Sequence, residues 1–341
     1  MDNYAREEMM HNNSAGGMQE NKRYLSKIGL RYFIASILIM AAQIGLGTLV
    51  YLIDKNIYNR YGFLIMMVVM YALAYPIIFW MLGKVPVEVH FEKQKLGFGR
   101  FLMFFVIGYA GMYISNIMGN VMANIIGAVK GSPVQNGITD IVMNNNLWLN
   151  FVIIVLCAPV FEELLFRKYL IDRMARFGEK YAIFMSGLFF GLFHGNLYQF
   201  SYAFVLGIVF GYVYVKTGNI KYTISLHMII NFMGSVVGTL LLKYTGIDKL
   251  IKAANETPEE LMKIMQENAA GLLIMMIYLV IILVLVILGV IFFALNVRKI
   301  NFRPGKAVIK SGEYFKTTVC NVGMILFFAL WIGFIIYSTL K

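Results

Sequence analysis

The sequence predicts an all-α protein, a polytopic transmembrane helical bundle with about eight or nine spans. Of its 341 residues, 60% are hydrophobic and only 14% are charged, a composition unlike that of a soluble domain. The apolar residues gather in long runs, and about 20 such residues suffice for one helix to cross a bilayer. The sequence offers nine such runs, at 29–53, 62–82, 101–127, 147–168, 181–197, 198–217, 220–244, 270–296 and 320–340.

The charge distribution indicates the orientation. The net charge is +12, and with the N-terminus placed inside, most Lys and Arg residues fall on the inner side. We therefore expect an integral multi-pass protein with a cytoplasmic N-terminus, and the short loops suggest a bacterial plasma membrane. Because the positive charge is spread over several loops, we expect membrane lipid as a partner and no nucleic acid.

The runs divide the chain into four parts. Residues 1–27 are polar and predict a disordered cytoplasmic tail, and residues 28–146 hold the N-terminal transmembrane helices. Residues 147–244 form a transmembrane core that carries the polar motifs, and 245–341 hold an amphipathic loop and the C-terminal transmembrane helices. The first apolar run is too long for a cleavable signal peptide, so we expect a membrane anchor. Two cysteines in apolar runs predict no disulfide.

Local signals shape the core. Pro159 should perturb the helix just before it. The helical pattern then stops near Gly178, and an antiparallel hairpin turning there would set Glu162 and His194 side by side, because each lies 16 residues away. The basic residues around this turn predict that it protrudes into the cytoplasm. Glycines at 187, 191 and 195 predict close helix packing, and Thr257-Pro258 predicts the start of a short helix ending near residue 267.

Three polar motifs lie on otherwise apolar segments. They are Glu162-Glu163-x-x-x-Arg167, Phe190-x-x-x-His194 and His227-x-x-x-Asn231. Ionisable residues inside a membrane are costly and usually functional. Each motif taken singly is as readily explained by helix packing or by a salt bridge at a helix end, whereas the ordered set is not.

The spacing assigns faces to these side chains. Neighbouring helical residues point about 100° apart, so Glu162 and Glu163 cannot face one partner. Glu163 and Arg167 are separated by four residues with the acid first, which favours an ion pair. Glu162 is then left to face a cavity. His227 and Asn231 project from one helix face in the same way, and Phe190 can support the ring of His194.

This ordered set resembles the CPBP family of intramembrane proteases, which includes the CAAX prenyl endopeptidases of the Rce type. The resemblance covers roughly residues 147 to 240. It implies an intramembrane endopeptidase that hydrolyses a peptide bond of a membrane-associated protein or peptide. Substrates in the family include prenylated CAAX proteins, and bacterial members act in peptide maturation and bacteriocin self-immunity.

Peptide hydrolysis requires an activated water, a stabilised oxyanion and a proton for the leaving amine. The resemblance and the chemistry together suggest Glu162 as the general base and Glu163 and Arg167 as its support. His194 would orient the water or assist proton transfer. His227 and Asn231 would donate hydrogen bonds to the oxyanion.

A metal variant of this mechanism is open. Two His and one Glu form a recognised catalytic zinc set, so Glu162, His194 and His227 are the candidate metal ligands of a metalloprotease. The HExxH motif is absent, however, and the ligands would come from three separate helices. The cofactor expectation is therefore either none that is obligatory or zinc.

Two other classes of function compete with a protease. A non-catalytic self-immunity or scaffolding protein could keep the motifs without turnover. A transporter could use the same ionisable residues as an ion pathway, although the sequence shows no evident inverted repeat.

Overall fold

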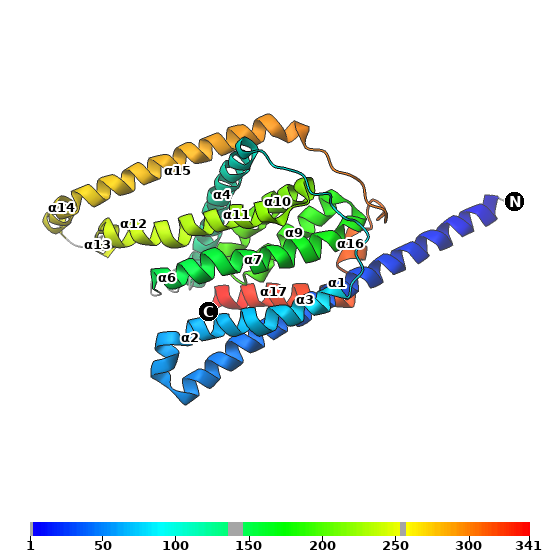
Figure 1. Cartoon of the computed structure of the whole chain (residues 1–341), viewed down its shortest axis with the longest axis horizontal. Coiled ribbons are helices and arrows are strands. Elements are labelled where there is room, and N and C mark those ends of the chain that lie inside the picture. Colours follow the sequence, from blue (N-terminus) through cyan, green and yellow to red (C-terminus); the bar gives the residue numbers. More distant parts are fainter. Residues whose placement is uncertain (1–2, 136–145, 253–256) are drawn as a thin grey trace.

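The computed structural model describes residues 3–135, 146–252 and 257–341, which fold into a helical bundle without strands (Figure 1). In these described ranges, eight helical stretches are long and apolar enough to cross a membrane. They are Gly17–Ile53, Lys55–Gly83, Phe98–Lys130, Leu147–Phe177, Leu197–Thr217, Ile220–Tyr244, Ala269–Lys299 and Val322–Leu340. The predicted fold class is confirmed, and the chain is an integral multi-pass membrane protein.

Residues 3–83 of the N-terminal part lie along one edge of the bundle, whereas residues 98–130 lie away from that edge, across the core helices (Figure 1). The elements of this part are α1 (Asn3–Ile53), α2 (Lys55–Val69), the π-helical segment η1 (Met70–Ala74), α3 (Tyr75–Gly83) and α4 (Phe98–Lys130). Helix α1 begins at Asn3, so the backbone of the expected disordered tail is helical. Tyr24 and Leu25, near the end of that tail, are buried in the protein, which shows that the last residues of 1–27 are packed.

The core part holds the motifs and lies in the middle of the bundle (Figure 1). Its first arm is α6 (Leu147–Asn150), η2 (Phe151–Cys157), α7 (Ala158–Glu163), η3 (Leu164–Ile171), α8 (Asp172–Met174) and the 3-10 turn η4 (Ala175–Phe177). The remaining elements are α9 (Glu179–Phe193), α10 (Leu197–Thr217), α11 (Ile220–Phe232), η5 (Met233–Val237) and α12 (Gly238–Tyr244).

The elements of the C-terminal part are α13 (Ile247–Lys252), α14 (Pro258–Glu267), α15 (Ala269–Asn296), the 3-10 turn η7 (Val297–Lys299), α16 (Tyr314–Thr318) and α17 (Val322–Leu340). Helix α14 has the predicted bounds, and the Thr257 side chain caps it by accepting a hydrogen bond from the Glu260 N–H. Helix α15 lies at the edge opposite α1 and α2, whereas α17 lies among the core helices (Figure 1).

The predicted fifth run forms α9, which has 15 residues and is shorter than the eight candidate spans. It nevertheless runs beside most of α17. At one end the Tyr181 and Thr318 hydroxyls are 3.0 Å apart. At the other end the Ser338 hydroxyl donates to the Gly195 carbonyl over 3.2 Å. Helix α9 therefore extends over most of the depth that α17 covers.

Pro159 perturbs its helix as predicted. A proline has no N–H for the helical hydrogen-bond pattern, and the turns before Pro159 form the π-helical segment η2, in which the Ala158 N–H donates to the Ile153 carbonyl. The same arrangement recurs at Pro76, where η1 precedes α3. Such π segments are frequent at functional sites, and this one ends just before the two adjacent glutamates.

The hairpin turns at Gly178, as the sequence predicts. Its φ is 106°, a backbone conformation that residues other than glycine rarely adopt. Beyond the turn, Gly187 and Gly191 bring α9 close to α10, because a Cβ at either position would meet α10 atoms at about 3 Å. Gly195 lies in the turn between α9 and α10 with φ of 66°, and it also packs closely as predicted, because a Cβ there would meet the Phe334 ring of α17 at 2.8 Å.

The turn is enclosed by protein instead of standing free. Arg173, Arg176 and Glu179 are buried there. Arg176 pairs with Glu20 of α1 and with Glu88 of the extended segment that follows α3. The burial of these charges corrects the reasoning that basic residues at the turn require exposure.

The apolar core lies directly behind the motifs. Tyr32 of α1 donates its hydroxyl to the Leu165 carbonyl over 2.6 Å. Its ring contacts Phe189 of α9 and Phe327 of α17 edge to face, and these two rings stack with centroids 4.0 Å apart. Helices α1, α9 and α17 thus support the segment that carries the glutamates.

Candidate active site

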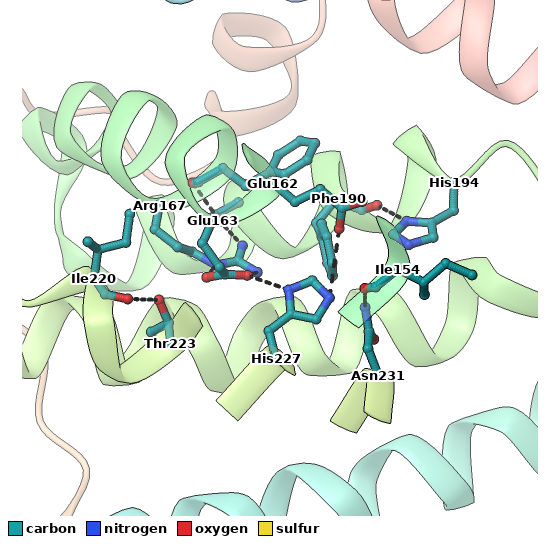
Figure 2. Close-up of polar contacts among 12 residues, drawn as sticks. Ile154, Glu162, Glu163, Arg167, Phe190, His194, Ile220, Thr223, His227 and Asn231 are labelled. Atoms are coloured by element: carbon teal, nitrogen blue, oxygen red, sulfur yellow. Dashed lines mark hydrogen bonds and ion pairs between the residues drawn. The ribbon is translucent and has the colours of Figure 1, made fainter. Parts of the chain in front are cut away.

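The site is built on three neighbouring helical arms (Figure 2). The first arm, α7 and η3, carries both glutamates and Arg167. The second, α9, ends at His194, and the third, α11, carries His227 and Asn231. All six side chains that the motifs predict are brought into one region.

Glu163 and Arg167 form the predicted ion pair. Arg167 Nε donates to Glu163 Oε2 over 2.9 Å and Nη2 donates to Oε1 over 3.2 Å, and both side chains are fully buried. A bidentate arrangement is the strong form of this contact. The third Arg167 nitrogen donates to the Ser186 hydroxyl over 2.6 Å, and this hydroxyl donates to the Phe166 carbonyl. All three guanidinium nitrogens of Arg167 therefore have hydrogen-bond partners within the protein.

The His227 ring lies against both glutamates, which corrects the expectation that Glu162 and Glu163 cannot face one partner: the two ring nitrogens reach different sides. Its Nδ1 lies 3.1 Å from Glu163 Oε1, and its Nε2 lies 3.8 Å from Glu162 Oε2. Because a carboxylate paired with arginine only accepts hydrogen bonds, Nδ1 carries the proton that is donated to Glu163. In the neutral ring, Nε2 then presents its lone pair towards Glu162.

The two adjacent glutamates differ in accessibility. The side chain of Glu162 is 24% exposed, whereas that of Glu163 is fully buried and paired. Glu162 makes no hydrogen bond in the described part of the chain beyond its approach to His227. It is thus the carboxylate that remains open to an incoming molecule.

His194 is fixed in one orientation. Its Nδ1 lies 2.7 Å from the Phe190 carbonyl, which accepts only, so Nδ1–H donates and Nε2 is free to accept. The Phe190 ring contacts the His194 ring edge to face, which confirms the predicted support, and it contacts His227 in the same way.

Asn231 fastens α11 to the first arm. Its Nδ2 donates to the Ile154 carbonyl over 2.9 Å. A side-chain amide has two N–H donors, so one donor is used by the protein and a second remains for a substrate oxygen.

Several residues around Glu162 escaped the sequence reasoning. The rings of Tyr71 and Phe161 stack with centroids 4.6 Å apart, next in sequence to the two glutamates, and the Tyr75 ring contacts the same Phe161 ring at 5.0 Å. Tyr71 and Tyr75 come from η1 and α3, far from the motifs in sequence. Of the supporting residues that the motifs do not contain, only Ser186 could have been noticed in the sequence, because it is a lone hydroxyl in an apolar helix.

The donor set Glu162, His194 and His227 has the chemistry of a zinc site, but its arrangement does not fit one. Within the described residues, no group of three or more His, Cys, Asp or Glu side chains is placed to hold a metal ion. The mechanism below therefore uses only the protein's own groups.

The comparisons with known proteins cover this same region. Residues 144–233 match the family model described as type II CAAX prenyl endopeptidase Rce1-like, and all six motif residues lie inside the match. The chain thus resembles the CPBP family of intramembrane proteases over residues 144–233. It is therefore a hydrolase that acts on peptide bonds.

The chain also resembles a Bacillus subtilis (strain 168) protein named "Putative membrane peptidase YdiL". The two are 23% identical over 183 residues, which cover 52% of this chain and 72% of the relative. No solved structure matches the chain. Helices α1 to α4 and α15 to α17 lie outside the family match. Tyr71 and Tyr75, which contact Phe161 beside the glutamates, therefore also lie outside it.

Proposed function

We propose that this protease hydrolyses a peptide bond of a membrane-associated protein or peptide with a water molecule activated by Glu162. The observation that carries the proposal is the contrast between the adjacent glutamates: Glu163 is neutralised by Arg167, and Glu162 is open and borders His227. The match to the CAAX endopeptidase model extends the candidate substrates to prenylated proteins.

The water is the first reactant to be positioned. It can donate one hydrogen to Glu162 and the other to His194 Nε2, because both are acceptors in the arrangement described above. Such a water points a lone pair away from both groups and towards a substrate carbonyl carbon. Glu162 then takes a proton as the water oxygen bonds to that carbon.

The other motif residues serve the later steps. His227 Nε2, 3.8 Å from Glu162, can receive the proton and then donate to the oxyanion together with the second Asn231 N–H. When the carbon–nitrogen bond breaks, the same proton passes to the leaving amine, so the products are one amine and one carboxylic acid, which keeps the second proton of the water. Glu163 and Arg167 keep His227 in the required tautomer throughout.

The orientation and location are part of this proposal. The positive inner loops support a cytoplasmic N-terminus, and the bacterial relative supports a bacterial plasma membrane. The catalytic part of the chain remains the predicted 147–244, with 28–146 and 245–341 as flanking transmembrane parts and 1–27 as a cytoplasmic tail.

The test compares protein termini in membranes and medium from cells that carry the wild-type chain or the Glu162→Gln variant. We expect new termini that require Glu162. A Glu179→Gln variant is the matched control, because it alters a buried glutamate at the far turn of the same hairpin. Identical termini in all three strains, at equal protein levels, would refute hydrolysis by Glu162.

A further inference from the structure

A chain of hydrogen bonds leads from the backbone carbonyl of His194 to a tyrosine that the motifs do not contain. It begins at Asn196, whose side-chain oxygen caps α10 by accepting from the Gln199 backbone N–H over 2.8 Å. The Asn196 Nδ2 donates both to the His194 carbonyl over 3.0 Å and to Gln199 Oε1 over 2.6 Å.

The direction of this chain is fixed by its first bond. A backbone N–H can only donate, so the atom of Asn196 that faces it must be the oxygen. Nδ2 therefore faces the Gln199 side chain, which must present its own oxygen there. The Gln199 Nε2 is then left to donate to the Tyr202 hydroxyl, over 2.8 Å. Consequently the Tyr202 oxygen accepts, and its own hydrogen is available for another acceptor.

Tyr202 lies on α10, which packs against both α9 and α11. The ring packs against both large apolar clusters, one containing Phe190 and the other containing Ile230, next to Asn231. The charge of Glu162 acts on the hydroxyl. Among the described residues, however, no acceptor receives its hydrogen.

Other tyrosines near the core differ in this respect. Tyr198, one turn earlier on α10, donates its hydroxyl to the Val134 carbonyl over 2.8 Å. Tyr214 donates to the Asp172 carboxylate over 2.7 Å. The hydroxyl hydrogens of Tyr198 and Tyr214 are donated within the protein, whereas the Tyr202 hydroxyl accepts from Gln199 and keeps its hydrogen for another acceptor.

We propose that Tyr202 is a further catalytic residue, which donates a hydrogen bond to the scissile carbonyl oxygen as that oxygen gains negative charge. Asn196 and Gln199 are positioning residues that set the direction of the donor. The tyrosine keeps its proton throughout, so the balance of the hydrolysis is unchanged. The inference rests on the proposed function, because it requires the Glu162 water to attack a carbonyl carbon.

The first test is Tyr202→Phe in the full chain, reconstituted in lipid vesicles. The probe is a synthetic peptide that spans a Glu162-dependent cleavage site found by the comparison of termini. Loss of one oxyanion donor lowers kcat about 10²–10³-fold, and we expect this with KM within about twofold. Tyr198→Phe is the matched control and should keep wild-type kcat. A Tyr202→Phe variant with wild-type kcat would overturn the proposal.

A second variant tests the direction of the chain while the tyrosine stays in place. In Gln199→Glu, a carboxylate would replace the donor, so the Tyr202 hydroxyl would turn to donate to it. We expect kcat to fall as far as in Tyr202→Phe, and the double variant to show no additional loss. Thermal unfolding of each variant in the same vesicles checks that the protein is folded. A folded Gln199→Glu variant with wild-type kcat would overturn the argument on direction.

The Glu162→Gln variant separates failure of this inference from failure of the proposed function. Cleavage that persists without the Glu162 carboxylate would refute the proposed function itself. If Glu162→Gln is inactive and Tyr202→Phe is fully active, only the role of Tyr202 is refuted.

Discussion

The two ends of the helical hairpin that turns at Gly178 both bury charged side chains, and they use them differently. At the turn, Glu179 receives a hydrogen bond from Lys216 and another from the Arg303 backbone, and Arg176 pairs with two segments distant in sequence. At the site, Glu163 is equally well paired, but its neighbour Glu162 is left without a bonded cation. The paired charges at the turn fasten segments together, whereas at the site the open carboxylate beside a paired one provides a reactive group.

The largest expected effect is on activity at the site. Glu162→Gln should lower kcat about 10²–10⁴-fold, the range that general-base catalysis supplies, because the proposed water loses its proton acceptor. Its thermal stability should match that of the wild type, since Glu162 is partly exposed and weakly engaged. Peptide cleavage and thermal unfolding in the same vesicles measure both quantities. A large loss of stability would mean that Glu162 belongs to the structural pairing instead.

The next effect is on stability at the same site. Arg167→Met should destabilise the fold by about 3–5 kcal/mol, because it leaves the buried Glu163 charge without compensation. The double variant Glu163→Gln with Arg167→Met removes both charges and should recover part of that loss. Unfolding by denaturant provides the measurement. If the double variant were less stable than Arg167→Met, the buried charge would not be the cause of the loss.

A smaller effect is expected at the turn. Glu179→Gln keeps an acceptor for the Arg303 N–H but removes the charge that Lys216 contacts, which should cost about 1.5–3 kcal/mol. Because the turn does not touch the reacting groups, kcat should stay within about threefold of the wild-type value. A loss of kcat as large as that of Glu162→Gln, in folded protein, would break the distinction between the two ends.

The smallest effect is expected for Glu20→Gln. The Glu20 side chain is 73% exposed, so its pair with Arg176 is a surface ion pair worth about 0–1 kcal/mol. The melting temperature should barely change, and activity should be that of the wild type. A clear loss of stability would show that this contact, rather than the buried Glu179, fastens α1 to the turn.

Most of the spans could be read from the sequence because long apolar runs have few alternatives in a membrane. The pairing of Glu163 with Arg167 was also accessible, since it depends only on helical periodicity. The short α9 was harder to interpret, because its length falls below that of a span, and its alignment with α17 depends on tertiary contacts at both of its ends.

The sequence by itself determined the class of the protein, the order of its helices and the three motifs that define its family, because composition, periodicity and local spacing are properties of neighbouring residues. Only the tertiary structure decided which partners the motif residues have. His227 reaches Glu163 across 64 positions of sequence, and Asn231 reaches the Ile154 carbonyl across 77. Contacts of that kind are set by how helices pack, and no local pattern specifies them.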